Sequence, residues 1–145
     1  MRESCFRGKR IPHGEWINGF LLICDERYFI IPETKIGCVT TEWLKKGEYA
    51  FYGFVEVDPD TVGEFSGKCD DNDRRIFEGD IADGLFCFTT PVRAVCIFKD
   101  GAFGLKWTLG GVDHFSAFTS LCNVACEVVV GNIYDNPEML EQEVQ

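Results

Sequence analysis

Apolar runs separated by short polar breaks follow one another along most of the chain. The runs are four to nine residues long and rich in Val, Ile, Phe and Tyr, the residues that favour strands. Turn formers stand between them, including Asp100-Gly101, a strong hairpin signal, and Gly110-Gly111. The predicted strands are Trp16–Cys24, Tyr28–Ile31, Tyr49–Val57, Leu85–Thr89, Val92–Phe98, Phe103–Leu109, Val112–Phe115 and Glu127–Tyr134. The pattern predicts a mainly β protein built from hairpins.

One stretch, Ser116–Ala125, has a helical pattern instead. Its apolar residues Phe118, Leu121, Cys122 and Ala125 recur at i, i+3, i+4 and i+7, which is the spacing of one helix face. Ser116 is placed where a capping side chain would stand. We therefore expect a short helix between the last two strands.

The stretch Phe65–Ile81 is expected to organise the second half of the chain. Its polar block Asp70–Asp73 reads as a solvated hairpin tip, because Asp and Asn bond their own backbone and tolerate positive φ. Glu78–Asp80 is a second bend that leads into a strand. Phe77 and Ile81 should therefore be buried under the later strands. Their expected neighbours are Val95, Ile97 and Phe103.

These elements predict two subdomains. Residues 1–57 form an N-terminal β-hairpin subdomain, and residues 58–64 form a connector. Residues 65–137 form a small barrel, and residues 138–145 are an acidic tail, either a short helix or disordered. A chain of 145 residues is long enough for two such small units.

The net charge of the chain and its distribution limit the kinds of molecule that the chain is expected to bind. The net charge is −10, and residues 58–80 hold eight acidic against three basic side chains. Such a chain repels a phosphate backbone at long range, so nucleic acid is an unlikely partner. The exception is a basic block, Arg7, Lys9 and Arg10, with Trp16 nearby. This block is either a contact site for nucleic acid or a partner, or a solvated strand edge protected by charge, and we favour the strand edge.

The chain has eight cysteines, an even number that could suggest disulfides, but their context indicates a reducing compartment. No secretory leader and no run of about 18 apolar residues is present, so we expect no membrane contact and a cytoplasmic location. Cys24, Cys87 and Cys96 each lie in an apolar run. We expect free thiols that act mostly as small buried hydrophobic side chains.

No constellation of catalytic or metal-binding residues emerges. The histidines, His13 and His114, stand in a turn and at a strand end, without the spacing of a nucleophile. Cys122 and Cys126 are a lone i, i+4 pair, whereas zinc sites usually show two pairs. Asp70–Asp73 starts like a calcium loop, but Arg74 and Arg75 occupy its fifth and sixth positions. We therefore expect no enzyme activity, no cofactor and no metal.

Three stretches carry a resemblance. They are Met1–Glu3 with Phe6–Arg10, Val57–Ile81 with its Phe77–Ile81 end, and Gly131–Glu138. Together and in this order they resemble the YopX family, found largely in phages and prophages of Gram-positive bacteria. The resemblance implies a phage-derived protein with a C-terminal SH3-like barrel and no established biochemical function.

The resemblance has one departure, and it concerns the hairpin tip. Where the family usually has Asn-Gly, this chain has Asn72-Asp73. Since Asp is less suited than Gly to positive φ, we expect a tip longer than two residues.

These observations lead to one functional expectation and one rival. We expect a non-enzymatic phage or prophage accessory protein in the cytoplasm of a bacterial host. It would act through contact with an unknown phage or host protein, or through self-assembly as a homo-oligomer. The alternative is a nucleic-acid-binding module that uses the N-terminal basic face.

Overall fold

The computed structural model describes residues 4–12, 14–33, 54–119 and 124–141, and the chain divides into two units between Glu64 and Phe65. In the first unit the strands pair antiparallel in the order β4-β3-β2-β1-β5. The elements are β1 (Phe6–Lys9), β2 (Trp16–Cys24), β3 (Arg27–Pro32), β4 (Val55–Val57), the 3-10 turn η2 (Pro59–Thr61) and β5 (Gly63–Cys69), which runs on into the second unit.

The first unit is a set of hairpins over a small core. The predicted turn at Asp25-Glu26 joins β2 to β3, and β3 ends at Pro32 as expected, since Pro has no N–H for the ladder. Ile30 and Val57 are fully buried. Of the predicted strand Tyr49–Val57, the described part forms β4, and Tyr49–Gly53 lies outside the described residues.

The predicted connector, residues 58–64, lies within the first unit. Asp58 caps η2 by accepting a hydrogen bond from Asp60 N–H at 3.0 Å. The buried Thr61 accepts a hydrogen bond from the N–H of Lys9 at 2.8 Å through its hydroxyl. These bonds hold the segment against β1.

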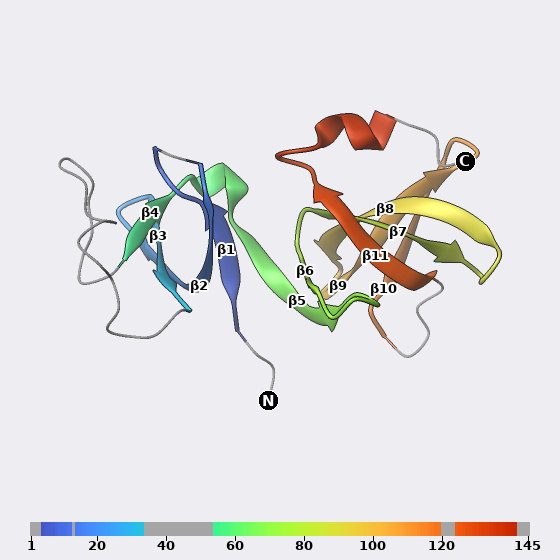
Figure 1. Ribbon diagram of the computed structural model, residues 1–145, viewed down its shortest axis with the longest axis horizontal. Coiled ribbons are helices and arrows are strands. Elements are labelled where there is room, and N and C mark those ends of the chain that lie inside the picture. Colours follow the sequence, from blue (N-terminus) through green and yellow to red (C-terminus); the bar gives the residue numbers. More distant parts are fainter. Residues whose placement is uncertain (1–3, 13, 34–53, 120–123, 142–145) are drawn as a thin grey trace. The chain divides into compact units, whose positions relative to one another are not determined.

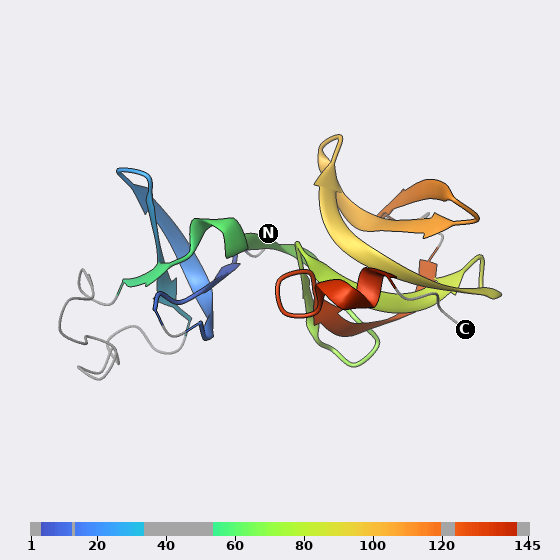
Figure 2. The same ribbon diagram turned by 90° about the horizontal axis from the view of Figure 1, so that it is seen from above.

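The second unit is a curled antiparallel sheet in the order β10-β9-β8-β7-β11, with the β5–β6 hairpin beside it (Figures 1 and 2). Its elements are β6 (Arg75–Phe77), β7 (Asp80–Phe86), β8 (Thr90–Lys99), β9 (Ala102–Leu109), β10 (Val112–Ala117), β11 (Val124–Asn132) and the 3-10 helix η3 (Pro137–Glu141). Its core holds alternate residues of β8 and β9, from Val92 to Cys96 and from Phe103 to Trp107. The mainly β fold with a small, half-closed barrel in the second half is therefore confirmed.

Two element predictions are wrong. The residues expected to begin a helix, Ser116 and Ala117, end β10, and Val124 begins β11; residues 120–123 lie outside the described part. A tertiary ladder with β9 satisfies the backbone of this segment in place of a helix. The strand predicted at Leu85–Thr89 is also shifted, because β7 runs from Asp80 to Phe86 and the chain then turns.

Candidate functional site

The predicted hairpin stretch, Phe65–Ile81, makes hydrogen bonds to β11 in the second unit. Asp70 is 5% exposed, so the prediction of a wholly solvated tip is wrong for this residue. Its Oδ1 accepts the N–H groups of Asn72 and Arg74, each at 2.9 Å, and its Oδ2 accepts the N–H of Val129 in β11 at 2.9 Å. The N–H of Asp71 donates to the carbonyl of Glu127 at 3.0 Å. The tip thereby covers one edge of β11.

The contacts of the hairpin tip also determine the charge state of Asp70. Burial opposes ionisation of Asp70, but the three backbone donors and the Arg74 charge together outweigh it and lower the pKa of this carboxyl. Lys68 forms an ion pair with the buried Glu127, and its ammonium lies 4.9 Å from the ring centroid of Phe118. The tip is longer than two residues, as expected, with Asp73 at φ 60°. The Asp70 carboxylate and the Lys68–Glu127 ion pair therefore connect this hairpin to β11.

The second bend joins two of the stretches that carry the family resemblance. Gly79 has φ 91°, its N–H donates to the carbonyl of Cys96, and its carbonyl accepts from Ile133 N–H at 2.9 Å. A Cβ on Gly79 would lie 3.0 Å from the ring of Tyr134. Asn132 accepts from Tyr134 N–H with its side-chain oxygen at 3.0 Å and closes the turn after β11. These residues therefore shape the fold rather than a reactive site.

The expected burial of Phe77 and Ile81 is confirmed, at 4% and 0% exposure. Ile81 pairs with Val95 across β7 and β8, as predicted. Phe77 packs on Phe65, with ring centroids 5.6 Å apart. The stretch is thus a core component of the second unit.

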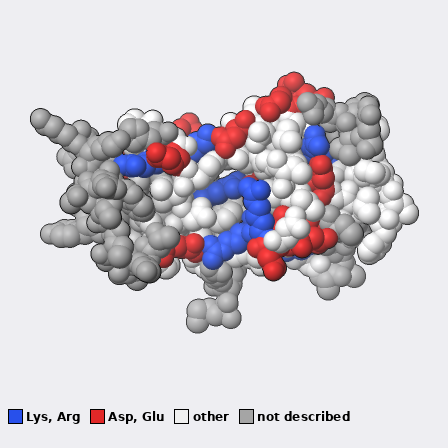
Figure 3. Space-filling model, viewed as in Figure 1, with Lys and Arg blue, Asp and Glu red and all other residues white. Residues whose placement is uncertain are grey.

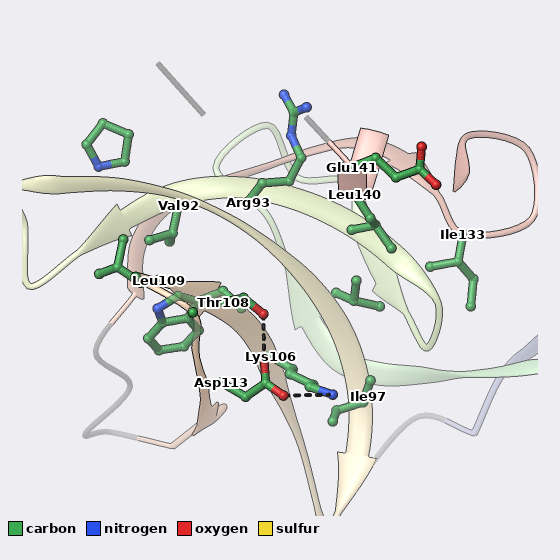
Figure 4. A pocket seen from close by; sticks show the side chains of 15 residues that line it. Val92, Arg93, Ile97, Lys106, Thr108, Leu109, Asp113, Ile133, Leu140 and Glu141 are labelled. Carbon is green, nitrogen blue, oxygen red and sulfur yellow. Dashed lines mark hydrogen bonds and ion pairs between the residues drawn. The ribbon is translucent and has the colours of Figure 1, made fainter. Parts of the chain in front are cut away.

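A groove of about 770 Å³ lies in the second unit (Figure 4). Val95 and Ile97 of β8 contribute apolar side chains on the face turned away from the sheet core, and Ile133 and Leu140 add apolar surface from the C-terminal segment. Pockets of this size and lining suit the apolar side chains of a ligand or peptide.

Charged residues border the groove at both sides. Arg93 holds Asp83 with two hydrogen bonds, at 2.7 and 3.1 Å, and donates at 3.3 Å to the carbonyl of Met139, which ties η3 to β8. On the other side Asp113 accepts from the Thr108 hydroxyl at 2.6 Å and lies 3.9 Å from the ammonium of Lys106 (Figure 4). The Thr108 hydroxyl and then the Lys106 charge lower the pKa of Asp113. The border is therefore zwitterionic at neutral pH.

His114 lies in an aromatic cluster. Its ring stacks on Trp107, with centroids 5.4 Å apart and planes 12° apart, and Phe86 lies 5.9 Å away. Among the described residues no hydroxyl or thiol is hydrogen-bonded to this ring. His114 therefore serves packing here, and His13 lies outside the described residues.

Of the predicted contact residues in the N-terminal basic block, Arg7 and Lys9 lie beside the ring of Trp16. The guanidinium of Arg7 lies 4.7 Å and the ammonium of Lys9 5.5 Å from the ring centroid of Trp16. Arg7 and Arg10 are buried, and Arg10 lies 3.7 Å from Glu15. Two of the three cations are thus part of the packed sheet. On the face drawn in Figure 3, basic side chains have acidic ones nearby.

The cysteines divide differently from the prediction. Cys96 is buried as expected, and so is Cys5, but Cys24 and Cys87 are exposed because each lies at a hairpin end. Free thiols are seen at Cys5, Cys24, Cys69, Cys87 and Cys96. The side chains of the pair Cys122 and Cys126 lie outside the part that the structure describes. In the described ranges no three His, Cys, Asp or Glu side chains cluster as metal ligands.

Fold and groove together define a class: an all-β protein of two small units, the second a curled half-barrel with a groove lined by apolar and charged side chains. The chain belongs to the YopX family, because the family model described as YopX protein matches residues 6–141.

Among solved structures, the crystal structure of protein EF1440 from Enterococcus faecalis is similar, with 20% sequence identity and a TM-score of 0.52 over 97% of this chain and 99% of that one. This likeness bears on the fold. No curated protein matches the chain. Across the described residues, no helix is long and apolar enough to cross a bilayer.

Proposed function

We propose that this chain is a non-catalytic accessory protein, phage-derived and acting in the cytoplasm of a bacterial host, that works by binding other proteins through the groove of the second unit. The observation that carries the proposal is the groove itself, with apolar side chains along its floor and charges of both signs at its border. Apolar contacts supply affinity, and the border charges orient a partner.

Two further observations support a binding role. Arg93 fixes η3 against β8, so one wall of the groove is held in position before a partner arrives. The residues of the family resemblance at Gly79 and Asn132 serve turns, whereas Val95, Ile97 and Leu140 present apolar surface in the groove.

Affinity capture from extracts of the host tests the proposal. A tagged chain should retain a specific protein, and Leu140→Glu should weaken retention by about tenfold or more, because a carboxylate would enter the apolar groove. Leu22→Glu is the matched control, since Leu22 is similarly exposed, at 40% against 45% for Leu140, but lies in the first unit. Equal retention by all three chains would refute the groove as the binding surface.

The alternative function is nucleic-acid binding by the N-terminal basic face. The observation in its favour is the aromatic ring of Trp16 with two cations, Arg7 and Lys9, near it, since aromatic rings in a basic setting are typical of single-strand binding sites. A salt titration with DNA and RNA tests it, because phosphate contacts impose a steep loss of affinity as salt rises. Binding that is lost in Lys9→Gln and falls steeply with salt would favour this alternative.

A further inference from the structure

The turn between β7 and β8 is formed by residues that do not favour the backbone conformation which the turn adopts. Cys87 and Phe88 are both left-handed, with φ 51° and 64°. Such a pair of positive φ values favours Gly, Asn and Asp. The described part of the chain has three other such pairs, and each contains Asp or Gly: Asp25-Glu26, Asp100-Gly101 and Gly110-Gly111. The turn at Cys87-Phe88 is therefore strained in a way that the others avoid.

In this strained turn the aromatic ring of Phe88 is exposed to solvent. Phe88 is 76% exposed, the highest value among the large apolar side chains of the described residues. The β7–β8 hairpin ends at the right of the second unit in both ribbon views (Figures 1 and 2). Neither burial nor turn chemistry explains a Phe at this position, and strain of this kind persists where it serves a function.

We propose that Phe88 is the anchor of a self-association contact and enters the groove of a second copy of this chain. The proposal rests on the proposed function, since it uses the same groove. Phe88 precedes Pro91, a groove residue, by three positions, which is about 10 Å of extended strand. The groove, which runs along β8 from Pro91 to Ile97, therefore begins at the end of the strand that carries the anchor. A two-fold axis near this end brings each Phe88 to the groove of the other copy, which closes a dimer.

Charge does not oppose a second copy at this place, although it does elsewhere on the surface. The chain carries −10, so two copies repel each other over most of their surface. Residues 84–92, which contain the anchor and the first groove residues, hold no charged side chain. The groove volume of about 770 Å³ accommodates an aromatic ring with its flanking residues.

Light scattering and sedimentation of the full chain, under reducing conditions, test the proposal. The parent chain should form a dimer at micromolar concentration. Phe88→Ser and Leu140→Glu should each raise the dissociation constant by about tenfold or more, since one removes the anchor and the other blocks the groove. Phe20→Ser is the control, because Phe20 is also exposed, at 54%, but lies in the first unit.

Mixing the two variants separates a direct contact from a folding defect. Neither variant can pair its anchor with a groove in a homodimer, but an anchor-intact chain can still enter the groove of an anchorless one. The mixture should therefore recover a heterodimer with one contact. A monomeric parent, or a mixture without heterodimer, would overturn the inference. That result would leave capture of a different protein by the groove intact, so the two proposals fail separately.

Discussion

Asp70 allows a quantitative test of how the hairpin tip supports the second unit. Asp70→Asn keeps the size of the side chain and removes its charge. Of its three backbone donors, those of Asn72 and Arg74 lie in an exposed turn, where water can replace the carboxylate. Val129 N–H is buried, and an amide nitrogen turned toward it would set donor against donor.

The expected cost follows from these contacts. A hydrogen bond to a charged acceptor contributes about 1.5–3 kcal/mol, and a buried donor left unsatisfied costs about 1–3 kcal/mol. Because the two turn bonds are largely replaceable, we expect Asp70→Asn to lower the free energy of unfolding by about 2–3 kcal/mol. That is a large part of the roughly 5–15 kcal/mol of a typical domain. Urea unfolding at neutral pH measures it.

The pH dependence has a definite sign. The pKa of Asp70 is lower in the folded chain than its ordinary value of 3.8, so the unfolded chain binds the proton first as pH falls. The stabilisation is therefore complete above that value and is lost as pH falls through it toward the folded pKa. Consequently the difference in unfolding free energy between the parent and Asp70→Asn should shrink in acid.

The control is Asp73→Asn, which makes the same charge change in the same turn. Asp73 is exposed, and Asn tolerates its φ of 60°, so we expect a change within about 0.5 kcal/mol. Hydrogen exchange of Val129 N–H adds a local readout and should be faster in Asp70→Asn alone. If both variants unfold alike, or if the difference is constant in acid, the carboxylate does not hold β11 in place.

Three further predictions concern the second unit. Phe77→Ala should lower the unfolding free energy by about 3–5 kcal/mol in a denaturant melt, because it empties a buried site; a parent-like melt would make the hairpin peripheral. Gly79→Ala should cost more than about 1 kcal/mol by the same measurement, since its φ is 91° and the new methyl group would press on Tyr134; an unchanged midpoint would contradict this. Cys87→Asn combined with Phe88→Gly should stabilise the fold by about 1 kcal/mol, because Asn-Gly suits the turn; a lower thermal midpoint would show that the strain is absent.

The sequence alone determined the β class and the hairpin stretch. Strand-forming residues between turn formers have a local preference for hairpins. Asp100-Gly101 favours a tight turn of the chain through its own backbone preference. The burial of Phe77 and Ile81 was also predictable, since the hydrophobic effect drives apolar residues that flank a polar tip out of water. The family could also be identified from the sequence, because the turn-forming stretches typical of it occur in the same order along this chain.

Tertiary structure decided the rest. Ser116 and Ala117 belong to a strand because β9 offers hydrogen-bond partners that a helical periodicity does not reveal. Asp70 is buried because β11, 59 positions further on, brings the Val129 N–H to its carboxylate. The groove is lined by β8, β9 and Leu140. The hydrogen bond from Arg93 to the carbonyl of Met139 holds the segment that carries Leu140 near β8. Long-range pairing sets these features, and a local pattern of residues does not encode the partner that lies across a sheet.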